Sequence, residues 1–341
     1  MLETIWFVLW GVLWTGYFVL DGFDLGLGAM MPFLARNDAE RRLVFNAQGP
    51  FWDGNEVWLI TAGGATFAAF PLTYAVMFSA LYTPLMLLLF ALILRGISFE
   101  MRSKEAAPLW RRTWDTCMVV GSFLPALLLG VAFANIFKGL PLDAQGILHG
   151  NLLTLLNPYG LLGGALFVLL FAVHGSIWLS IKVAGELGER GARLAARLWP
   201  ALLAVAVAFL AMSAAVTDLF ANIGRWPLLA VFPLLAVAGL LGTRLFLARR
   251  ARWRAWTASA ATIAGATAFG VAGLYPRLLP SSLDPAATLT AHNSASSQLT
   301  LSIMLGVALV FVPIVIAYQV WVYRTFAFPI DERDLEGHNA Y

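Results

Sequence analysis

Long apolar runs separated by short polar segments form the dominant pattern along the chain. A transmembrane helix needs about 20 consecutive, mainly apolar residues. Runs of roughly that length predict an all-α integral membrane protein with nine transmembrane helices, the second and third joined by a tight hairpin around Pro71. The predicted spans are Thr4–Leu34, Val57–Pro71, Tyr74–Arg95, Thr116–Phe137, Pro158–Ile181, Trp199–Ala221, Leu228–Leu247, Trp256–Leu274 and Leu299–Tyr323.

The order of the spans fits a single polytopic membrane domain made of two halves. Four spans occupy approximately residues 1–150, four more occupy residues 151–274, and a final helix covers residues 299–323. This order is compatible with a parallel internal repeat that has one additional helix. The two halves show no clear sequence similarity to each other, so the repeat is left open.

Composition supports the membrane fold and excludes several classes of function. The chain has 341 residues, of which 60% are hydrophobic and 12% are charged, with a mean hydropathy of +0.78, whereas soluble domains contain about 25% charged residues. Glu3 stands where a signal peptide would carry a basic residue, so we expect the first span to be retained. The single cysteine, Cys117, excludes an internal disulfide. The short loops carry no nucleotide-binding or protease motif, so we expect function within the membrane and no nucleic-acid partner.

The distribution of basic residues predicts the orientation of the chain. Of the 22 Lys and Arg residues, 19 fall on one side of the predicted bundle, and Lys138, Arg225 and Arg277 fall on the other. Loops on the cytoplasmic side carry the excess of Lys and Arg, so the N-terminus is predicted outside and the C-terminus in the cytoplasm. The longest outer loop, residues 275–298, is rich in Ser, Thr, Ala and Pro and is expected to carry little structure.

Two aspartates interrupt the first span, in the half nearer the cytoplasm. Asp21 and Asp24 are three residues apart and therefore share one helix face. A charged group in a span costs a few kcal/mol or more unless it has a partner, water or a proton. The pair is either a proton-loading or ion site, or a set of hydrogen-bonded ties between helices. Gly22 and Gly26 form a GxxxG pattern that allows a neighbouring helix to approach closely.

A second acidic pair, Asp53 and Glu56, stands at the cytoplasmic start of the second span. The sequence Asp-Gly-Asn-Glu resembles a capping box, in which Asp53 is the N-cap and Glu56 the third helical residue. The alternative is a proton relay at the level of Asp24, with Arg95 at the end of the third span as the counter-charge. Near an arginine, burial raises the pKa of a carboxyl group and the cation lowers it. The two interpretations are compatible.

Three other side chains have a structural and a functional interpretation. His174 is the only histidine within a span and is either a helix-packing residue or an axial ligand of a haem. Trp58, like most of the tryptophans, lies near a span end, where anchoring at the membrane interface explains it. Asp115 is expected to cap a helix. From these residues alone, a secondary transporter and a subunit of a respiratory complex are rival functions.

Several motifs, in family order over nearly the whole chain, closely resemble subunit II of cytochrome bd quinol oxidases. The stretch WDGNEVWLITAGGA is the most specific of them. The segments that carry the resemblance are DGFDLGLGAMMPFLARNDAERR (Asp21–Arg42), GPFWDGNEVWLITAGGATFAAFP (Gly49–Pro71), LRGISFEMRSK (Leu94–Lys104), WDTCMVVGSFLPALLLGVAFANIFKGLP (Trp114–Pro141), LLNPYGLLGG (Leu155–Gly164) and SSQLTLSIM (Ser296–Met304).

The resemblance implies two four-helix bundles plus one peripheral helix, in the cytoplasmic membrane of a bacterium. It implies a heterodimer with subunit I, often joined by a small single-span subunit. Such a complex oxidises quinol, reduces O2 to water and takes protons from the cytoplasm. The two b-type haems and one d-type haem are expected in subunit I, so this chain is expected to bind none directly. A quinone held as a structural ligand is also compatible with the resemblance.

The resemblance further assigns roles to individual residues. Asp24 and Asp53 match aspartates associated with a proton route toward the haems, and Asp21, Glu56 and Arg95 are expected to accompany them. Trp58 matches a tryptophan beside an apolar O2 route in some members. The outer segment 222–227 is shorter than in some members, which puts any role of a longer loop there in doubt. An independent secondary transporter or ion-conducting protein is the alternative function.

Overall fold

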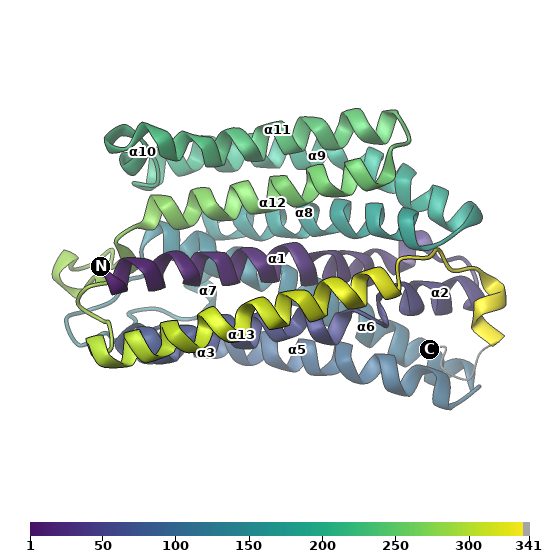
Figure 1. Ribbon diagram of the computed structural model, residues 1–341, viewed down its shortest axis with the longest axis horizontal. Helices are drawn as coiled ribbons and strands as arrows, with labels where there is room; N and C mark the ends of the chain where they lie inside the picture. The colour runs from purple at the N-terminus through teal and green to yellow at the C-terminus, as the bar shows by residue number, and fades with distance from the viewer. Residues whose placement is uncertain (337–341) are drawn as a thin grey trace.

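Long helices that run along a common axis make up most of the computed structural model, of which residues 1–336 are described (Figure 1). The α-helices are α1 (Leu2–Leu34), α2 (Asp38–Gln48), α3 (Trp52–Ala69), α4 (Pro71–Ala80), α5 (Tyr82–Met101), α6 (Pro108–Lys138), α7 (Leu152–Leu155), α8 (Pro158–Lys182), α9 (Gly185–Val216), α10 (Ala221–Arg225), α11 (Val231–Ala248), α12 (Arg252–Leu274) and α13 (Gln298–Thr325). The shorter elements are the 3-10 helices η1 (Arg102–Lys104), η2 (Pro227–Ala230), η3 (Pro285–Ala287) and η4 (Glu332–Glu336) and the strands β1 (Arg277–Leu279) and β2 (Leu289–Thr290).

The predicted all-α membrane fold is confirmed. Within residues 1–336, eight helices are long and apolar enough to cross a membrane. The remaining predicted span, Val57–Pro71, corresponds to α3, which has 18 residues and carries Asp53, Asn55 and Glu56 at its start. These three polar residues lower its mean hydropathy. Nine crossings and the orientation of the chain therefore stay predictions.

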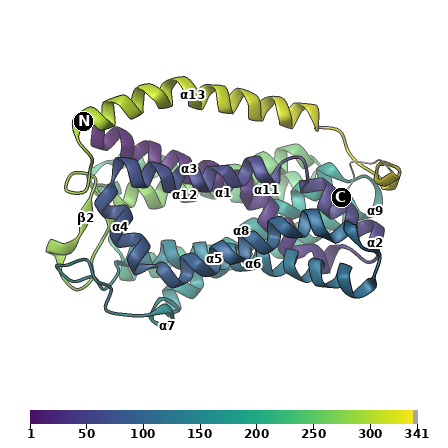
Figure 2. The ribbon, with the colours of Figure 1, turned by 90° about the horizontal axis from the view of Figure 1, so that it is seen from below.

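Helix α1 lies at the centre of the bundle, where it contacts α3, α6, α8 and α12. Among the other long helices, the main pairs are α5 with α6, α6 with α8, α8 with α9, and α11 with α12. Helix α13 runs along the outside, next to α3 and α1 (Figure 2). Of its residues, only Leu301 is buried. The last helix is therefore attached to the bundle through a small number of contacts.

Close packing of α1 on α8 depends on glycines of both helices. A Cβ atom at Gly22 would lie 2.7 Å from the ring of Phe171, and one at Gly26 would overlap the carbonyl group of Phe171. Across the interface, a Cβ atom at Gly175 would overlap the backbone of α1 at Phe23 and Leu27. The GxxxG pattern therefore marks the crossing of α1 with α8, as small residues allow two helix backbones to approach.

Two sequence-based expectations about the predicted outer end are wrong. The tight hairpin at Pro71 is instead the ten-residue helix α4, which connects α3 to α5 (Figure 2). Proline at its first position starts this helix, because a first-turn residue needs no backbone N–H partner. The loop 275–298 is also more ordered than expected, since β1 and β2 pair in it and its Leu278 and Leu279 are buried.

The other end of the bundle carries α2 and the C-terminal segment after α13 (Figure 1). This segment is fastened to the end of α8. Lys182 Nζ donates hydrogen bonds to the carbonyl oxygens of Phe326, at 2.5 Å, and Phe328, at 2.7 Å. Ile330 N donates to the carbonyl oxygen of Lys182 at 2.8 Å. This is the end where the sequence places most of the basic residues and predicts the cytoplasm.

Replacing Gly26 with alanine should destabilise the α1–α8 crossing, because the new methyl group meets a backbone carbonyl that cannot rotate away. We expect a loss of about 1–3 kcal/mol or more, the usual range for overpacking, seen as a lower melting temperature of the purified protein in detergent. Gly306→Ala is the matched control, since a Cβ atom there has no neighbour within 4 Å. Equal melting temperatures for the two variants would contradict this account of the crossing.

Candidate functional site

An arginine–aspartate ion pair lies inside the bundle, between α5 and α1. Arg95 Nη2 is 2.8 Å from Asp21 Oδ1, and neither side chain is exposed to solvent. Transferring such charges out of water costs several kcal/mol per ion, so each requires the other. Arg95 does not end a span, as the sequence had indicated, because α5 continues to Met101.

Two further carboxyl groups face the same arginine. Glu56 Oε2 lies 3.6 Å from Arg95 Nη1, and Asp24 follows Asp21 on the same face of α1 and is fully buried. Asp21 Oδ2, Asp24 Oδ1 and Glu56 Oε2 are buried without a hydrogen-bond partner among the described residues. One guanidinium group cannot neutralise three carboxylates, and uncompensated charge in a bundle is costly. Bound protons relieve this excess, so the cluster is suited to hold and release protons.

Asn55 is the part of the site that sequence reasoning missed. It is fully buried, and its Nδ2 donates a hydrogen bond of 2.7 Å to Asp24 Oδ2. Its Oδ1 accepts hydrogen bonds from two residues of α13, Gln319 and Tyr323. The signal was its place between Asp53 and Glu56, where a neutral amide attracts less attention than the charges beside it.

Asp53 is exposed at the edge of a cleft of about 560 Å³ between α3 and α13. Glu100 lines the same cleft and is a second carboxylate there. Sequence reasoning had not identified Glu100. The capping-box interpretation of Asp53 is wrong. Helix α3 already begins at Trp52, so that Asp53 lies inside its first turn, and no side chain caps the helix. A carboxylate in the first turn is still favoured by the helix dipole.

Trp58 lies one turn after Asn55 on α3 and also lines the cleft. Its indole Nε1 donates a hydrogen bond of 2.9 Å to Gln319 Oε1 of α13. Besides lying near a span end, where it can anchor at the membrane interface, Trp58 therefore makes a specific contact with α13. The role of Trp58 beside an O2 route stays a prediction.

His174 of α8 is fully buried and uses both of its ring nitrogens within the bundle. Its Nε2 lies 3.1 Å from the carbonyl oxygen of Val19, which only accepts, so Nε2 carries the hydrogen. Its Nδ1 then accepts from the hydroxyl group of Ser259 at 3.1 Å. The ring also stacks on Trp256, with centroids 5.0 Å apart. An axial haem ligand needs a free nitrogen, so this geometry favours the packing interpretation.

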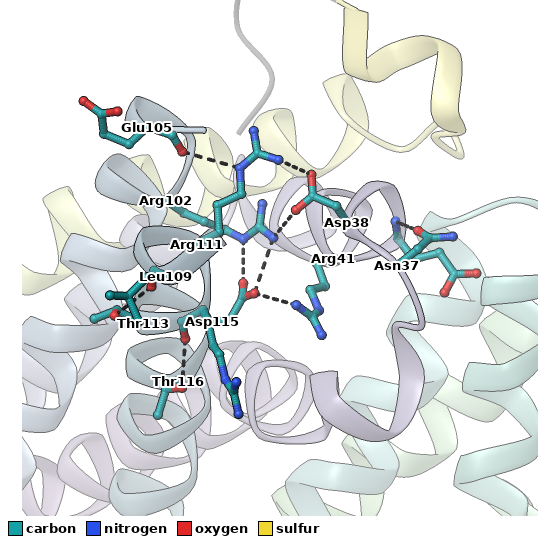
Figure 3. Close-up of polar contacts among 12 residues, drawn as sticks. Asn37, Asp38, Arg41, Arg102, Glu105, Leu109, Arg111, Thr113, Asp115 and Thr116 are labelled. Atoms are coloured by element: carbon teal, nitrogen blue, oxygen red, sulfur yellow. Dashed lines mark hydrogen bonds and ion pairs between the residues drawn. The ribbon is translucent and has the colours of Figure 1, made fainter. Parts of the chain in front are cut away.

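A network of ion pairs joins α2 to the adjacent ends of α5 and α6 (Figure 3). Arg102 Nε lies 2.5 Å from Asp115 Oδ1, and Arg102 Nη2 lies 2.8 Å from Asp38 Oδ1. Arg111 Nη1 approaches the other oxygen of Asp38 at 2.9 Å, and Arg41 Nη1 approaches Asp115 at 3.0 Å. The expected helix cap at Asp115 is therefore wrong, because α6 begins at Pro108 and this carboxylate binds arginines instead.

The same network fixes the charge of Asp38, which lies outside the spans. Partial burial raises the pKa of Asp38, but the hydrogen bond from Arg102 and the positive charges of Arg102 and Arg111 together lower the pKa by more than burial raises it. The net result is a pKa below the ordinary value. Asp38 is thus ionised at neutral pH, unlike a group that exchanges protons, so we assign this network to holding α2 in place.

Comparisons with known proteins agree on one family. The chain matches the family described as cytochrome bd terminal oxidase subunit II over residues 2–326. It is 37% identical to cytochrome bd ubiquinol oxidase subunit 2 of Bacillus subtilis, over 95% of this chain and 96% of that protein. It is also 37% identical to cytochrome bd-I ubiquinol oxidase subunit 2 of Escherichia coli K12, over 100% of this chain and 99% of that protein. The fold resembles a chain of the bd oxidase from Geobacillus thermodenitrificans, with a TM-score of 0.77, 17% identity and coverage of 95% and 98% of the two chains.

Removing one member of the buried ion pair should cost more than removing both. We expect Arg95→Met to lower the stability of the purified protein by about 3–5 kcal/mol, because it leaves buried carboxylates without a counter-charge. Adding Asp21→Leu should restore a large part of the melting temperature. Arg112→Met, at an exposed arginine of α6, is the control and should have little effect. A double variant less stable than Arg95→Met would show that the pair is not the source of the loss.

Proposed function

The chain belongs to the cytochrome bd terminal oxidase subunit II family, and from this premise we propose that it is a haem-free subunit that delivers protons from the cytoplasm to the haems of its partner. As a member of this family it is a subunit of a quinol oxidase of aerobic respiration. Membership also implies a subunit I partner. We also propose that the chain lies in the cytoplasmic membrane of a bacterium.

One observation carries the proton-delivery proposal: three carboxyl groups, two of them fully buried, surround a single buried arginine. Exposure decreases from Asp53 in the cleft, through Glu56, to the fully buried Asp21 and Asp24. Such a series offers protons a way from water at the predicted cytoplasmic end into the bundle. Arg95 keeps part of the negative charge stable, so that the remaining carboxyl groups can gain and lose a proton.

The proposed absence of haem from this chain is supported by the donors that it offers. His174 is the one histidine in a membrane-spanning helix, and both of its nitrogens are bonded within the bundle. We therefore place the two b-type haems and the d-type haem in subunit I, together with the chemistry of O2 reduction.

A structural quinone, if the complex holds one on this chain, needs an apolar site open to the membrane. The apolar cavity lined by Phe18 and Phe133 has a volume of about 110 Å³, which is smaller than the roughly 150 Å³ that accommodates benzene. A groove of about 520 Å³ runs between α1, α11 and α12 and is lined by Phe7, Trp226 and Phe232. This groove is the better candidate for the apolar tail.

The partner and its haems can be tested directly. We expect the tagged chain, isolated from native membranes in mild detergent, to bring down a larger subunit and to show the absorption bands of b-type and d-type haems. A small single-span subunit in the same preparation would complete the family pattern. A lone, colourless chain that catalyses substrate flux in vesicles would contradict the proposal and favour an independent transporter or ion-conducting protein.

The proton route predicts slow turnover without loss of haem. Asp24→Asn and Asp53→Asn keep the size of each side chain but cannot carry a proton, so quinol-dependent O2 consumption should fall about tenfold or more. The haem spectrum of the purified complex should be unchanged. Asp218→Asn, at an exposed aspartate that pairs with Arg277 at the predicted outer end, is the control. Normal turnover of both Asp24→Asn and Asp53→Asn would refute the route.

A further inference from the structure

A chain of hydrogen bonds links the peripheral helix α13 to Asp24. Trp58 Nε1 donates to Gln319 Oε1 at 2.9 Å, and Gln319 Nε2 donates to Asn55 Oδ1 at 3.1 Å. Tyr323 Oη donates to the same Asn55 oxygen at 2.9 Å. Asn55 Nδ2 then donates to Asp24 Oδ2 at 2.7 Å and to the carbonyl oxygen of Leu20 at 3.3 Å.

Two groups fix the direction of the bonds in this chain: the indole of Trp58 at one end and the carbonyl oxygen of Leu20 at the other. An indole nitrogen only donates, so Trp58 forces the oxygen of the Gln319 amide toward itself and the amide nitrogen toward Asn55. Asn55 must then present its oxygen to α13 and its nitrogen to Asp24. The carbonyl oxygen of Leu20 only accepts and favours the same orientation, so both N–H groups and both acceptor positions of Asn55 are used. Trp58 and the Leu20 carbonyl together therefore ensure that Asp24 meets a donor.

We propose that Gln319, Tyr323 and Trp58 are positioning residues that, through Asn55, set how readily Asp24 binds a proton. This inference rests on the proton route proposed above and adds a function for α13. A hydrogen bond donated to a carboxylate favours its charged form. Without an oriented Asn55, Asp24 holds its proton more strongly.

The fit of α13 supports a specific rather than a general packing role. Leu301 is the only buried residue of this helix, yet Gln319 and Tyr323 reach across to a fully buried amide of α3. The ring of Tyr323 packs against Phe51, with centroids 4.7 Å apart, so the hydroxyl group can be removed without removing the ring. The charged and titratable side chains that act on Asp24 are Asp21 of α1, Glu56 of α3, Arg95 of α5 and Tyr323 of α13. On the side of α8, His174 contacts α1 at the carbonyl oxygen of Val19.

The experiment compares pH profiles of quinol-dependent O2 consumption by the purified complex. In Gln319→Leu and Trp58→Phe, Asn55 loses the orienting contact with Gln319 and is held less firmly, by Tyr323 and the Leu20 carbonyl alone, so the alkaline decline in turnover should move upward by up to about 1 pH unit. Tyr323→Phe should move it in the same direction by a smaller amount. Assays at saturating O2 remove any contribution of Trp58 to oxygen access. Tyr318→Phe is the matched control, because Tyr318 lines the same cleft on the same helix but makes no hydrogen bond to Asn55.

The outcomes separate this inference from the proposed function. If Asp24→Asn turns over normally, Asp24 is not part of the proton route and the role of α13 is refuted with it; normal turnover of Asp53→Asn as well would refute the whole route. If Asp24→Asn is slow but Gln319→Leu, Trp58→Phe and Tyr323→Phe keep the unaltered pH profile, the route stands and the positioning role is refuted. Adding Gln319→Leu to Asp24→Asn should cause no further shift, and a further shift would show that Gln319 acts through another group. An unchanged haem spectrum establishes that each variant complex is assembled.

Discussion

The buried charge of Arg95 is the constraint on which the rest of the structure depends. A guanidinium group keeps its charge at any physiological pH, so a bundle that contains it must also place carboxyl groups beside it. Asp21 comes from α1 and Glu56 from α3, and this fixes three helices around one point. Because α1 also contacts α6, α8 and α12, the position of the arginine is transmitted to both halves of the chain. The excess of carboxyl groups over arginine then gives the same point its capacity for protons.

A second set of polar contacts holds the predicted cytoplasmic end in a way that leaves the proton cluster undisturbed. Arg102 ties α5 to α2 through Asp38 and to α6 through Asp115, while Lys182 fastens the segment after α13 to α8. These ion pairs balance their charges, and Asp38, whose pKa is lowered, stays ionised. The two sets of contacts differ in their balance of charge. Where arginines match or outnumber carboxylates, the contacts are structural. Where carboxylates outnumber the arginine, a proton has to take the place of the missing cation.

The sequence was sufficient for most of the fold but for only part of the candidate site. Apolar length predicts helices because lipid leaves the backbone no other partner, and the glycines of α1 indicate a close crossing because only small residues allow one. Local rules failed where the answer depended on distant residues. Asp53 resembles an N-cap, but the helix begins one residue earlier, at Trp52. Asn55 meets Gln319 and Tyr323 across more than 260 residues of sequence, and no local pattern of a single sequence records such a pair. The charged residues could be identified, because charge in a span is costly, whereas the neutral amides that orient them could not.

Packing density differs on the two sides of α1, and this difference suits the proposed direction of proton access. Toward α8, the glycines Gly26 and Gly175 bring the two backbones into contact and leave no space for water. Toward α3 and α13, a cleft reaches Asp53, Asn55 and Trp58. On the proposed route, a proton approaches Asp24 from the side where α13 lies. A tightly packed α13 would close that side, and without α13 the oxygen of the Asn55 amide would lose both of its hydrogen-bond donors. A helix that is held by a few hydrogen bonds leaves the cleft open and still orients Asn55. This explains why α13, although nearly unburied, carries Gln319 and Tyr323 directed at the bundle.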